Sequence, residues 1–149
     1  MLEALKFSCR ESLEIDPKIL FDEFLKVENW DDFNGFLFLP GIKRAKFITQ
    51  TKDLTGSIIK VENMDDSFHH ETIIEWVVDK KIVIEFNQFS KPLSHLASHF
   101  IEVWEVRKVQ DIEFLHRSFE LYLVSRLKKI LFGLSLNFLK LQFVVTQKK

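Results

Sequence analysis

A histidine and a glutamate inside two strand-like segments are the residues whose chemistry stands out first. His116 lies next to Arg117 in "IEFLHRSFELYLV", and Glu102 interrupts the apolar pattern of "HFIEVWEVRKV". An imidazole titrates near neutral pH, so in a cavity His116 could anchor a carboxylate or a phenol, or act as a general base. The alternative is a hydrogen-bonded strand histidine at the sheet surface. His116 and Glu102 are the candidate catalytic residues, and whether the protein is an enzyme stays open.

Three glutamates interrupt apolar strand patterns. Glu75, Glu102 and Glu105 each lie inside an otherwise apolar strand pattern. Because side chains alternate between the two faces of a strand, at least one of the three is expected to point outward on a solvated face. A glutamate turned into a cavity would instead have a perturbed pKa and could serve as an acid or base. The sequence contains no phosphate-binding loop, nucleophile elbow or paired-carboxylate spacing.

The other histidines and the cysteine do not indicate a metal site or a nucleophile. His95 and His99 are four residues apart, which on a helix would put both imidazoles on one face, but their segment carries no carboxylate at ligand spacing. His69 and His70 are adjacent, so in a strand they point to opposite faces, and we expect them at the surface. Cys9 has no evident activating partner and is expected to pack within a strand. No metal and no cofactor are expected.

Composition limits the class of protein. The chain has 149 residues, which fits one domain, and its 21 Lys and Arg balance 22 Asp and Glu, so a dedicated nucleic-acid binder is not expected. A single cysteine cannot form an internal disulfide, and charged residues interrupt the N-terminal segment "MLEALKFSCRESLEID", so we expect a cytoplasmic protein. The 16 Phe and 1 Tyr indicate either a bulky core or the wall of an apolar pocket.

The elements that must position these residues begin with a strand and two helices. Alternation predicts a strand over roughly 2–14. Asp16 followed by Pro17 predicts a capped helix that runs to about Glu28. A second short helix is expected over 30–37, with Asn29 as its cap, and Pro40 and Gly41 end it. On this interpretation the apolar run "FLFL" belongs to a helix and its exit and not to a strand.

The rest of the chain changes from strands to one long helix. Six segments rich in β-branched and aromatic residues follow Ile42, and short turns at 53–56, 65–66, 79–80, 90–92 and 110–111 separate them, which predicts an antiparallel meander. From 124 to 145 apolar residues recur every three or four positions, which predicts a long helix. Asn137, Lys140 and Gln142 interrupt that helix, so stable membrane insertion is not expected.

This order of elements resembles the helix-grip fold of the START-like superfamily, called SRPBCC, which includes polyketide cyclase/dehydrase and lipid-transport proteins. The local matches are "FDEFLKVENWDDF", "PGI", "ETIIEW" and "FIEVWEV". The segment "VQDIEFLHRS" departs from the family because it lacks the Gly-Thr that is common in relatives. The resemblance implies an α+β fold, in which a curved seven-stranded antiparallel sheet wraps around a long C-terminal helix and two short helices follow the first strand. It also implies that residues 1–149 are one ligand-binding domain.

The resemblance further implies a small hydrophobic ligand between the sheet and the long helix. Alternation places one set of apolar side chains on a common face of each of two strands, and others would close the cavity from the helix side. The predicted ligand-binding residues are Phe36, Phe38, Leu39, Ile82, Ile84, Phe86, Phe100, Trp104, Val106, Leu131, Leu134 and Phe138. Plain core packing is the alternative for each of them, because pockets and cores use the same residue types. Phe36, Phe38 and Leu39 would form a lid at the mouth of the pocket.

Three functions remain compatible with these patterns. The first is a carrier or sensor for a lipid, a quinone or a polyketide-like molecule, which requires a deep pocket with few polar groups. The second is a cyclase- or dehydratase-like enzyme, which requires a titratable residue such as His116 or Glu102 in the cavity. The third is a protein-interaction module without a ligand, with a filled core and an exposed apolar patch. Because apolar residues outnumber acid–base groups on the predicted inner face, the sequence favours the first.

Overall fold

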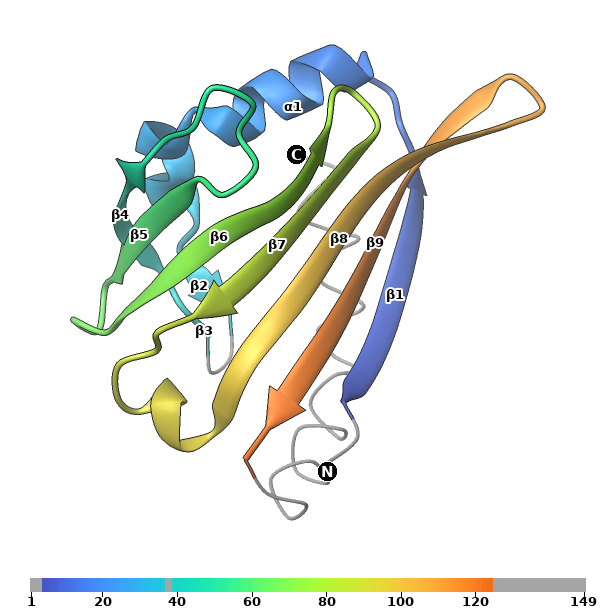
Figure 1. The fold of residues 1–149 in the computed structure, drawn as a ribbon. Coiled ribbons are helices and arrows are strands. Elements are labelled where there is room, and N and C mark those ends of the chain that lie inside the picture. Colours follow the sequence, from blue (N-terminus) through green and yellow to red (C-terminus); the bar gives the residue numbers. More distant parts are fainter. Residues whose placement is uncertain (1–3, 37–38, 125–149) are drawn as a thin grey trace.

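The structure is a computed structural model that describes residues 4–36 and 39–124. In this part of the chain, seven strands form one antiparallel sheet in the order β1-β9-β8-β7-β6-β5-β4, and two short strands, β2 and β3, pair separately. Figure 1 shows the curved sheet, with the helix α1 lying across one end of it. The predicted seven-stranded antiparallel sheet is confirmed, whereas the predicted long C-terminal helix lies outside the described residues.

The strand boundaries follow the sequence pattern closely. The strands are β1 (Leu5–Ser12), β2 (Gly35–Phe36), β3 (Leu39–Pro40), β4 (Ile42–Thr49), β5 (Ile58–Asn63), β6 (Phe68–Val77), β7 (Lys81–Asn87), β8 (Ala97–Val109) and β9 (Ile112–Leu123). The β8–β9 connection is a two-residue turn in which Gln110 and Asp111 both have positive φ, 49° and 66°. Two consecutive positive φ angles match the right-handed twist of a hairpin, so the two longest strands can pair along their full length.

The helix α1 (Pro17–Leu25) begins where the sequence predicts it. The Asp16 carboxylate accepts a hydrogen bond from the Lys18 amide at 2.8 Å, and Pro17 occupies the first turn, where its missing N–H costs nothing. The helix is shorter than expected and is followed by the 3-10 helix η1 (Val27–Asp32). None of the helices in 4–36 and 39–124 is long and apolar enough to cross a membrane.

The predicted second short helix is present as η1, but its expected bounds of 30–37 are wrong. The helical turn ends at Asp32, and Phe36 and Leu39 belong to the paired strands β2 and β3. The physical reason is a close backbone contact that the sequence pattern does not reveal. A Cβ atom on Gly41 would lie 2.9 Å from the carbonyl carbon of Asn34, and the Ile42 amide donates to the Phe33 carbonyl at 2.8 Å. The chain therefore folds back on itself here as a hairpin, with a glycine where only a glycine fits.

The main sheet has two chemically different faces. We call the face that α1 covers the inner face and the opposite one the outer face. Phe21 and Phe24 of α1 pack on Ile73, Ile82 and Ile84, which are all at most 1% exposed. Residues opposite one another in an antiparallel pair share a face, so the register assigns the other strands as well. The inner face carries Phe7 and Cys9 of β1, Leu115, Arg117, Phe119 and Leu121 of β9, and Phe100, Glu102, Trp104 and Val106 of β8.

Candidate functional site

Apolar side chains form most of the inner face. Ile82 and Ile84 are buried against α1, and Phe86, Trp104 and Val106 pack against the same cluster. These five residues were all predicted to share the inner face. The sixth predicted strand residue, Phe100, belongs to a second buried cluster farther from α1, made of Phe7, Ala97, Phe100, Phe119, Leu121 and Leu123. Phe86 packs against both clusters and so joins them into one apolar surface.

Aromatic rings dominate the part of this surface farthest from α1. The rings of Phe7 and Phe119 stack at a centroid distance of 4.7 Å. Phe100 lies 5.0 Å from Phe89 and 6.3 Å from Phe86. Flat rings that contact one another at these distances present a large apolar area with few rotatable bonds. This part of the inner face is therefore an apolar surface made of packed rings.

A buried ion pair interrupts the apolar surface between β8 and β9. The Arg117 guanidinium donates from both Nε, at 3.0 Å, and Nη2 to Oε1 of Glu102, and the Trp104 indole N–H donates to the same oxygen. Both charged side chains are nearly buried, at 11% and 6% exposed. The guanidinium also lies 4.7 Å from the centre of the Trp104 ring, at a distance typical of a cation–π contact. Glu102 is thus held as part of a network on the inner face.

A second polar pair lies on β6. The His69 Nε2 atom is 3.1 Å from Oε1 of Glu71, and the imidazole stacks on the Phe86 ring at 5.7 Å. Burial raises the pKa of the Glu71 carboxyl, the contact with His69 partly opposes this, and the charge of Glu102 adds to the rise. The expectation that His69 lies at the surface is wrong, because its side chain is only 13% exposed and its partner faces inward.

The raised pKa of Glu71 predicts a specific pH dependence of stability. In the folded protein this carboxyl keeps a proton that the unfolded chain releases above its ordinary pKa of 4.5. Its contribution to stability is therefore complete below that pH and is lost as the pH rises through the folded-state pKa. We expect Glu71→Gln, which stays neutral, to be more stable than the wild type at pH 8, with the difference vanishing near pH 4. Urea unfolding at the two pH values measures this.

A carboxylate on the neighbouring strand provides the control. The Arg44 Nε donates to Glu62 at 2.8 Å and lowers the pKa of that carboxyl. Glu62 therefore contributes stability above its unfolded pKa, and Glu62→Gln should lower stability at pH 8, the opposite sign. If Glu71→Gln also destabilises the protein at pH 8, the charged form of Glu71 is favoured by His69 and the assignment of a neutral carboxyl is incorrect.

The structure separates the two candidate catalytic residues. Glu102 lies on the inner face, whereas His116 lies on the outer face, opposite Arg10 and Glu105 in the register. Since adjacent strand residues point to opposite sides, Arg117 is the one that faces inward. Alternation of Leu115, Arg117, Phe119 and Leu121 was the signal in the sequence that could have identified it. Of the three strand glutamates, Glu75 and Glu105 lie on the outer face with half-buried side chains, 46% and 36% exposed, as expected for at least one of the three.

The remaining predicted site residues are not brought together by the described part of the structure. Phe36 and Leu39 are placed only as backbone in β2 and β3. Four others, Phe38, Leu131, Leu134 and Phe138, lie outside the described residues. Their proposed roles as lid and as helix side of a cavity stay predictions.

The residues considered as metal ligands or nucleophile have other partners. His95 belongs to the short 3-10 helix η2 (Leu93–His95), while His99 is in β8 and stacks on Tyr122 at 4.2 Å, so the two do not share a helix face. Among the described residues no group of three or more His, Cys, Asp or Glu is arranged to hold a metal ion. Burial raises the pKa of the Cys9 thiol, with the charge of Arg117 opposing it, so the thiol stays protonated at neutral pH.

Comparison with known proteins gives similarity in structure and not in sequence. No protein-family model matches the chain, and no curated protein matches its sequence. Among solved structures, a START superfamily protein from Mycobacterium smegmatis superposes with a TM-score of 0.62 at 12% identity, covering 97% of this chain and 99% of that one. Ginseng major latex-like protein 151 from Panax ginseng also gives 0.62 at 12% identity, covering 90% and 93%.

A third similar structure is longer than this chain. The di-domain ARO/CYC StfQ from the steffimycin biosynthetic pathway gives a TM-score of 0.62 at 11% identity, covering 81% of this chain and 38% of that one. At such low identity the likeness concerns the fold alone. The strand order, the position of α1 and these three superpositions agree with the resemblance found in the sequence. The chain has the fold of the START-like (SRPBCC) superfamily.

Proposed function

We propose that this protein binds a small hydrophobic molecule, such as a lipid, a quinone or a polyketide-like compound, on the inner face of the sheet and acts as a carrier or sensor. The observation that carries the proposal is the continuous apolar surface in which Phe86 links the α1 cluster to the cluster around Phe100. Only a few polar groups interrupt it. A site of this composition favours an apolar body and uses its few polar groups to orient the ligand.

The two polar pairs limit what the ligand can offer. Glu102 already receives three hydrogen bonds from Arg117 and Trp104. Burial favours the protonated form of Glu71, and a protonated carboxyl can donate a hydrogen bond to a carbonyl or hydroxyl oxygen. A suitable ligand therefore needs no donor for Glu102 and offers one oxygen that can accept a hydrogen bond from Glu71 on β6. The rest of its length is apolar.

Native mass spectrometry of the purified protein, followed by denaturing extraction, tests the proposal directly. A co-purified lipid, quinone or aromatic molecule is the expected result. Uptake of Nile red, a neutral dye, gives a second readout that does not depend on charge. An empty protein that also fails to take up the dye would contradict the proposal and would favour a protein-interaction module with a filled core.

A matched pair of variants locates the binding face. Phe100→Leu removes a ring from the inner face, and Phe114→Leu makes the same chemical change on the outer face. We expect the first to weaken dye binding roughly fivefold, about 1 kcal/mol, and the second to leave it unchanged. Thermal unfolding of both variants shows whether either has lost its fold. Equal effects of the two variants on dye binding would mean that the dye does not bind on the inner face.

A cyclase- or dehydratase-like activity is the second candidate. Two inner-face carboxyls lie in contrasting environments: Arg117 pairs with Glu102, while burial raises the pKa of Glu71. Such a contrast is typical of an acid and a base that work at one site. Extraction of two bound molecules whose masses differ by one water would favour this candidate, whereas a single species would favour the carrier.

A further inference from the structure

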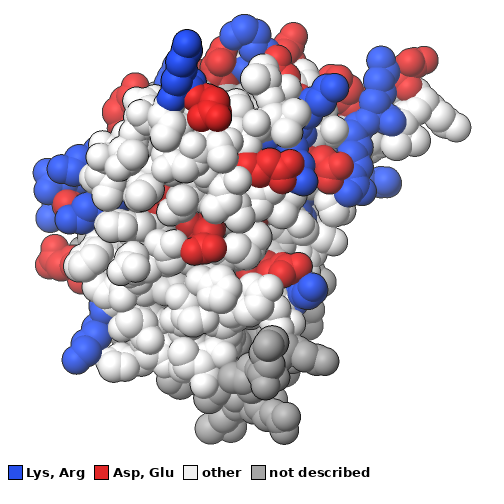
Figure 2. Space-filling view, in the orientation of Figure 1, with Lys and Arg blue, Asp and Glu red and all other residues white. Residues whose placement is uncertain are grey.

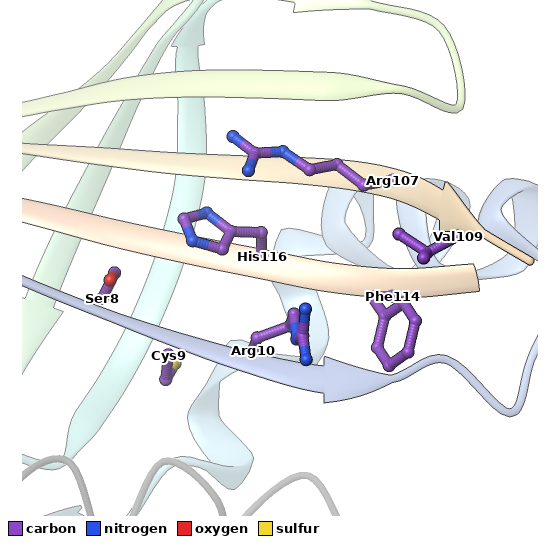
Figure 3. A pocket seen from close by; sticks show the side chains of 7 residues that line it. All are labelled: Ser8, Cys9, Arg10, Arg107, Val109, Phe114 and His116. Atoms are coloured by element: carbon purple, nitrogen blue, oxygen red, sulfur yellow. The ribbon is translucent and has the colours of Figure 1, made fainter. Parts of the chain in front are cut away.

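An open hollow of about 410 Å³ lies on the outer face, at the end of the sheet where the β8–β9 hairpin projects. Figure 3 shows its side chains, which come from the three neighbouring strands β1, β9 and β8. The lining residues of the outer face are Ser8, Arg10, Arg107, Val109, Phe114 and His116, and Cys9, which the register assigns to the inner face, also borders the hollow. Two guanidinium groups and an imidazole thus surround a space of the size that holds a small organic molecule. Figure 2 shows that charged side chains gather over this part of the outer face.

The register brings basic groups close to one another. Arg10 lies directly opposite His116 in the β1–β9 pair. Arg107 lies on β8 opposite Phe114, two residues beyond Glu105, which is opposite His116. Like charges directly opposite on neighbouring strands are unfavourable, and a protonated His116 would face Arg10 in this way. An anion between the two side chains would turn this repulsion into attraction.

The carboxylate opposite His116 on β8 already has its own partner. Glu105 lies opposite His116 on β8 and accepts from Arg107 Nη2 at 2.9 Å. This hydrogen bond, with a further contribution from the charges of Lys81 and His116, lowers the pKa of Glu105. In contrast, no ion pair within residues 4–36 and 39–124 involves Arg10, whose guanidinium lies over the Phe114 ring at 4.7 Å. Arg10 and His116 can therefore receive an external anion.

The apolar wall of the hollow limits the ligand further. Phe114 presents its ring below Arg10, and Val109 is 51% exposed near the hairpin tip. A flat apolar group can contact both of them while an attached carboxylate reaches Arg10 and His116. Arginine binds carboxylates in a planar, often bidentate geometry, which suits a ligand held by one end.

We propose that this hollow is a binding site for a small organic carboxylate whose flat apolar part lies against Phe114 and Val109. It lies on the opposite face of the sheet from the proposed hydrophobic site, so the two sites can be occupied independently. Affinity is expected to be higher at acidic pH, where an imidazole side chain carries a positive charge that attracts a carboxylate. The charged groups that face His116 are Arg10 on β1 and Glu105 and Arg107 on β8, and the neighbouring Ser8 is neutral.

Isothermal titration of the full chain with benzoate tests the site, because benzoate keeps the same charge between pH 6 and pH 8. We expect saturable binding at pH 6 that weakens at pH 8, and weaker binding of acetate, which lacks the ring. Arg10→Gln and His116→Gln should each lower affinity at pH 6 by at least about fivefold. His116→Gln should also remove the pH dependence.

Lys6→Gln is the matched control, because it removes one positive charge from the same strand and Lys6 pairs with Glu120, away from the hollow. It should leave benzoate affinity unchanged, as should Phe100→Leu on the inner face. Phe114→Leu should reduce the advantage of benzoate over acetate. Absence of saturable benzoate binding at millimolar concentrations would overturn the proposal, and so would equal losses in Lys6→Gln and Arg10→Gln. Loss of binding in Phe100→Leu would also overturn it, since benzoate would then occupy the inner face.

Discussion

Replacing Arg117 with leucine is expected to lower the free energy of unfolding by about 3–5 kcal/mol at pH 7. The substitution leaves Glu102, which is 6% exposed, as a buried carboxylate without its cationic partner. Of the hydrogen bonds from Arg117 and Trp104, only the one from the Trp104 indole remains. A single unpaired charge in an apolar environment costs far more than the pair contributes, because desolvation is no longer offset. Urea unfolding followed by tryptophan fluorescence measures the loss.

A double variant separates the charge effect from lost packing. Glu102→Gln with Arg117→Leu removes both charges but keeps an acceptor for the Trp104 indole. We expect this double variant to regain most of the stability that Arg117→Leu alone loses. If the losses in unfolding free energy of Glu102→Gln alone and Arg117→Leu alone add up to the loss in the double variant, the two residues are not energetically coupled. The ion pair would then make no net contribution to stability.

Removing the Phe21 ring is the second change with a large expected effect. Phe21 is 1% exposed and meets the Trp76 ring edge-on at 5.4 Å, so it fixes α1 to the inner face. Phe21→Ala should cost about 3–5 kcal/mol, since the lost apolar contact and the resulting cavity both destabilise the fold. The unfolding midpoint in urea measures the effect.

The exposed side of the same helix provides the comparison. Ile19 is 53% exposed on α1, and Ile19→Ala should change stability by no more than about 0.5 kcal/mol. A similar cost for the two substitutions would mean that α1 is held by its helical propensity and not by packing on the sheet. In that case the inner face near Trp76 would be more open than the structure indicates.

Local chemistry was sufficient to predict the strands and their turns. Alternation of apolar and polar residues identified β1, and enrichment in β-branched and aromatic residues between short turns identified β4 to β9. Asp79, Gln110 and Asp111 all have positive φ at predicted turns. Because the side-chain period of a strand is two, the same pattern also placed Ile82, Ile84, Phe100 and Trp104 on the inner face.

Residue type alone was a poor guide to which polar side chains lie on the inner face. His116 was considered as a cavity group for its chemistry, but its position in the alternating pattern puts it on the outer face. Arg117 was overlooked although the same alternation puts it inside, beside Glu102. His69 and Glu71 are two residues apart on one strand, and nothing local distinguishes their face as the buried one. Which carboxyl is paired and which is neutral depends on neighbours from other strands.

Local patterns were sufficient for the strands along the chain, their short turns and the alternation of their faces, because these depend on residues close together in the chain, while the class of fold came from the family resemblance. The pairing of Gly35 and Phe36 with Leu39 and Pro40 could not be predicted locally, since the contact between Gly41 and Asn34 forms only when the chain folds back. The register of β9 with its two neighbours also depends on the folded sheet: pairing with β8 brings Arg117 beside Glu102, and pairing with β1 places His116 opposite Arg10. Polar partners on different strands meet through register, and register is set by the packing of the whole sheet.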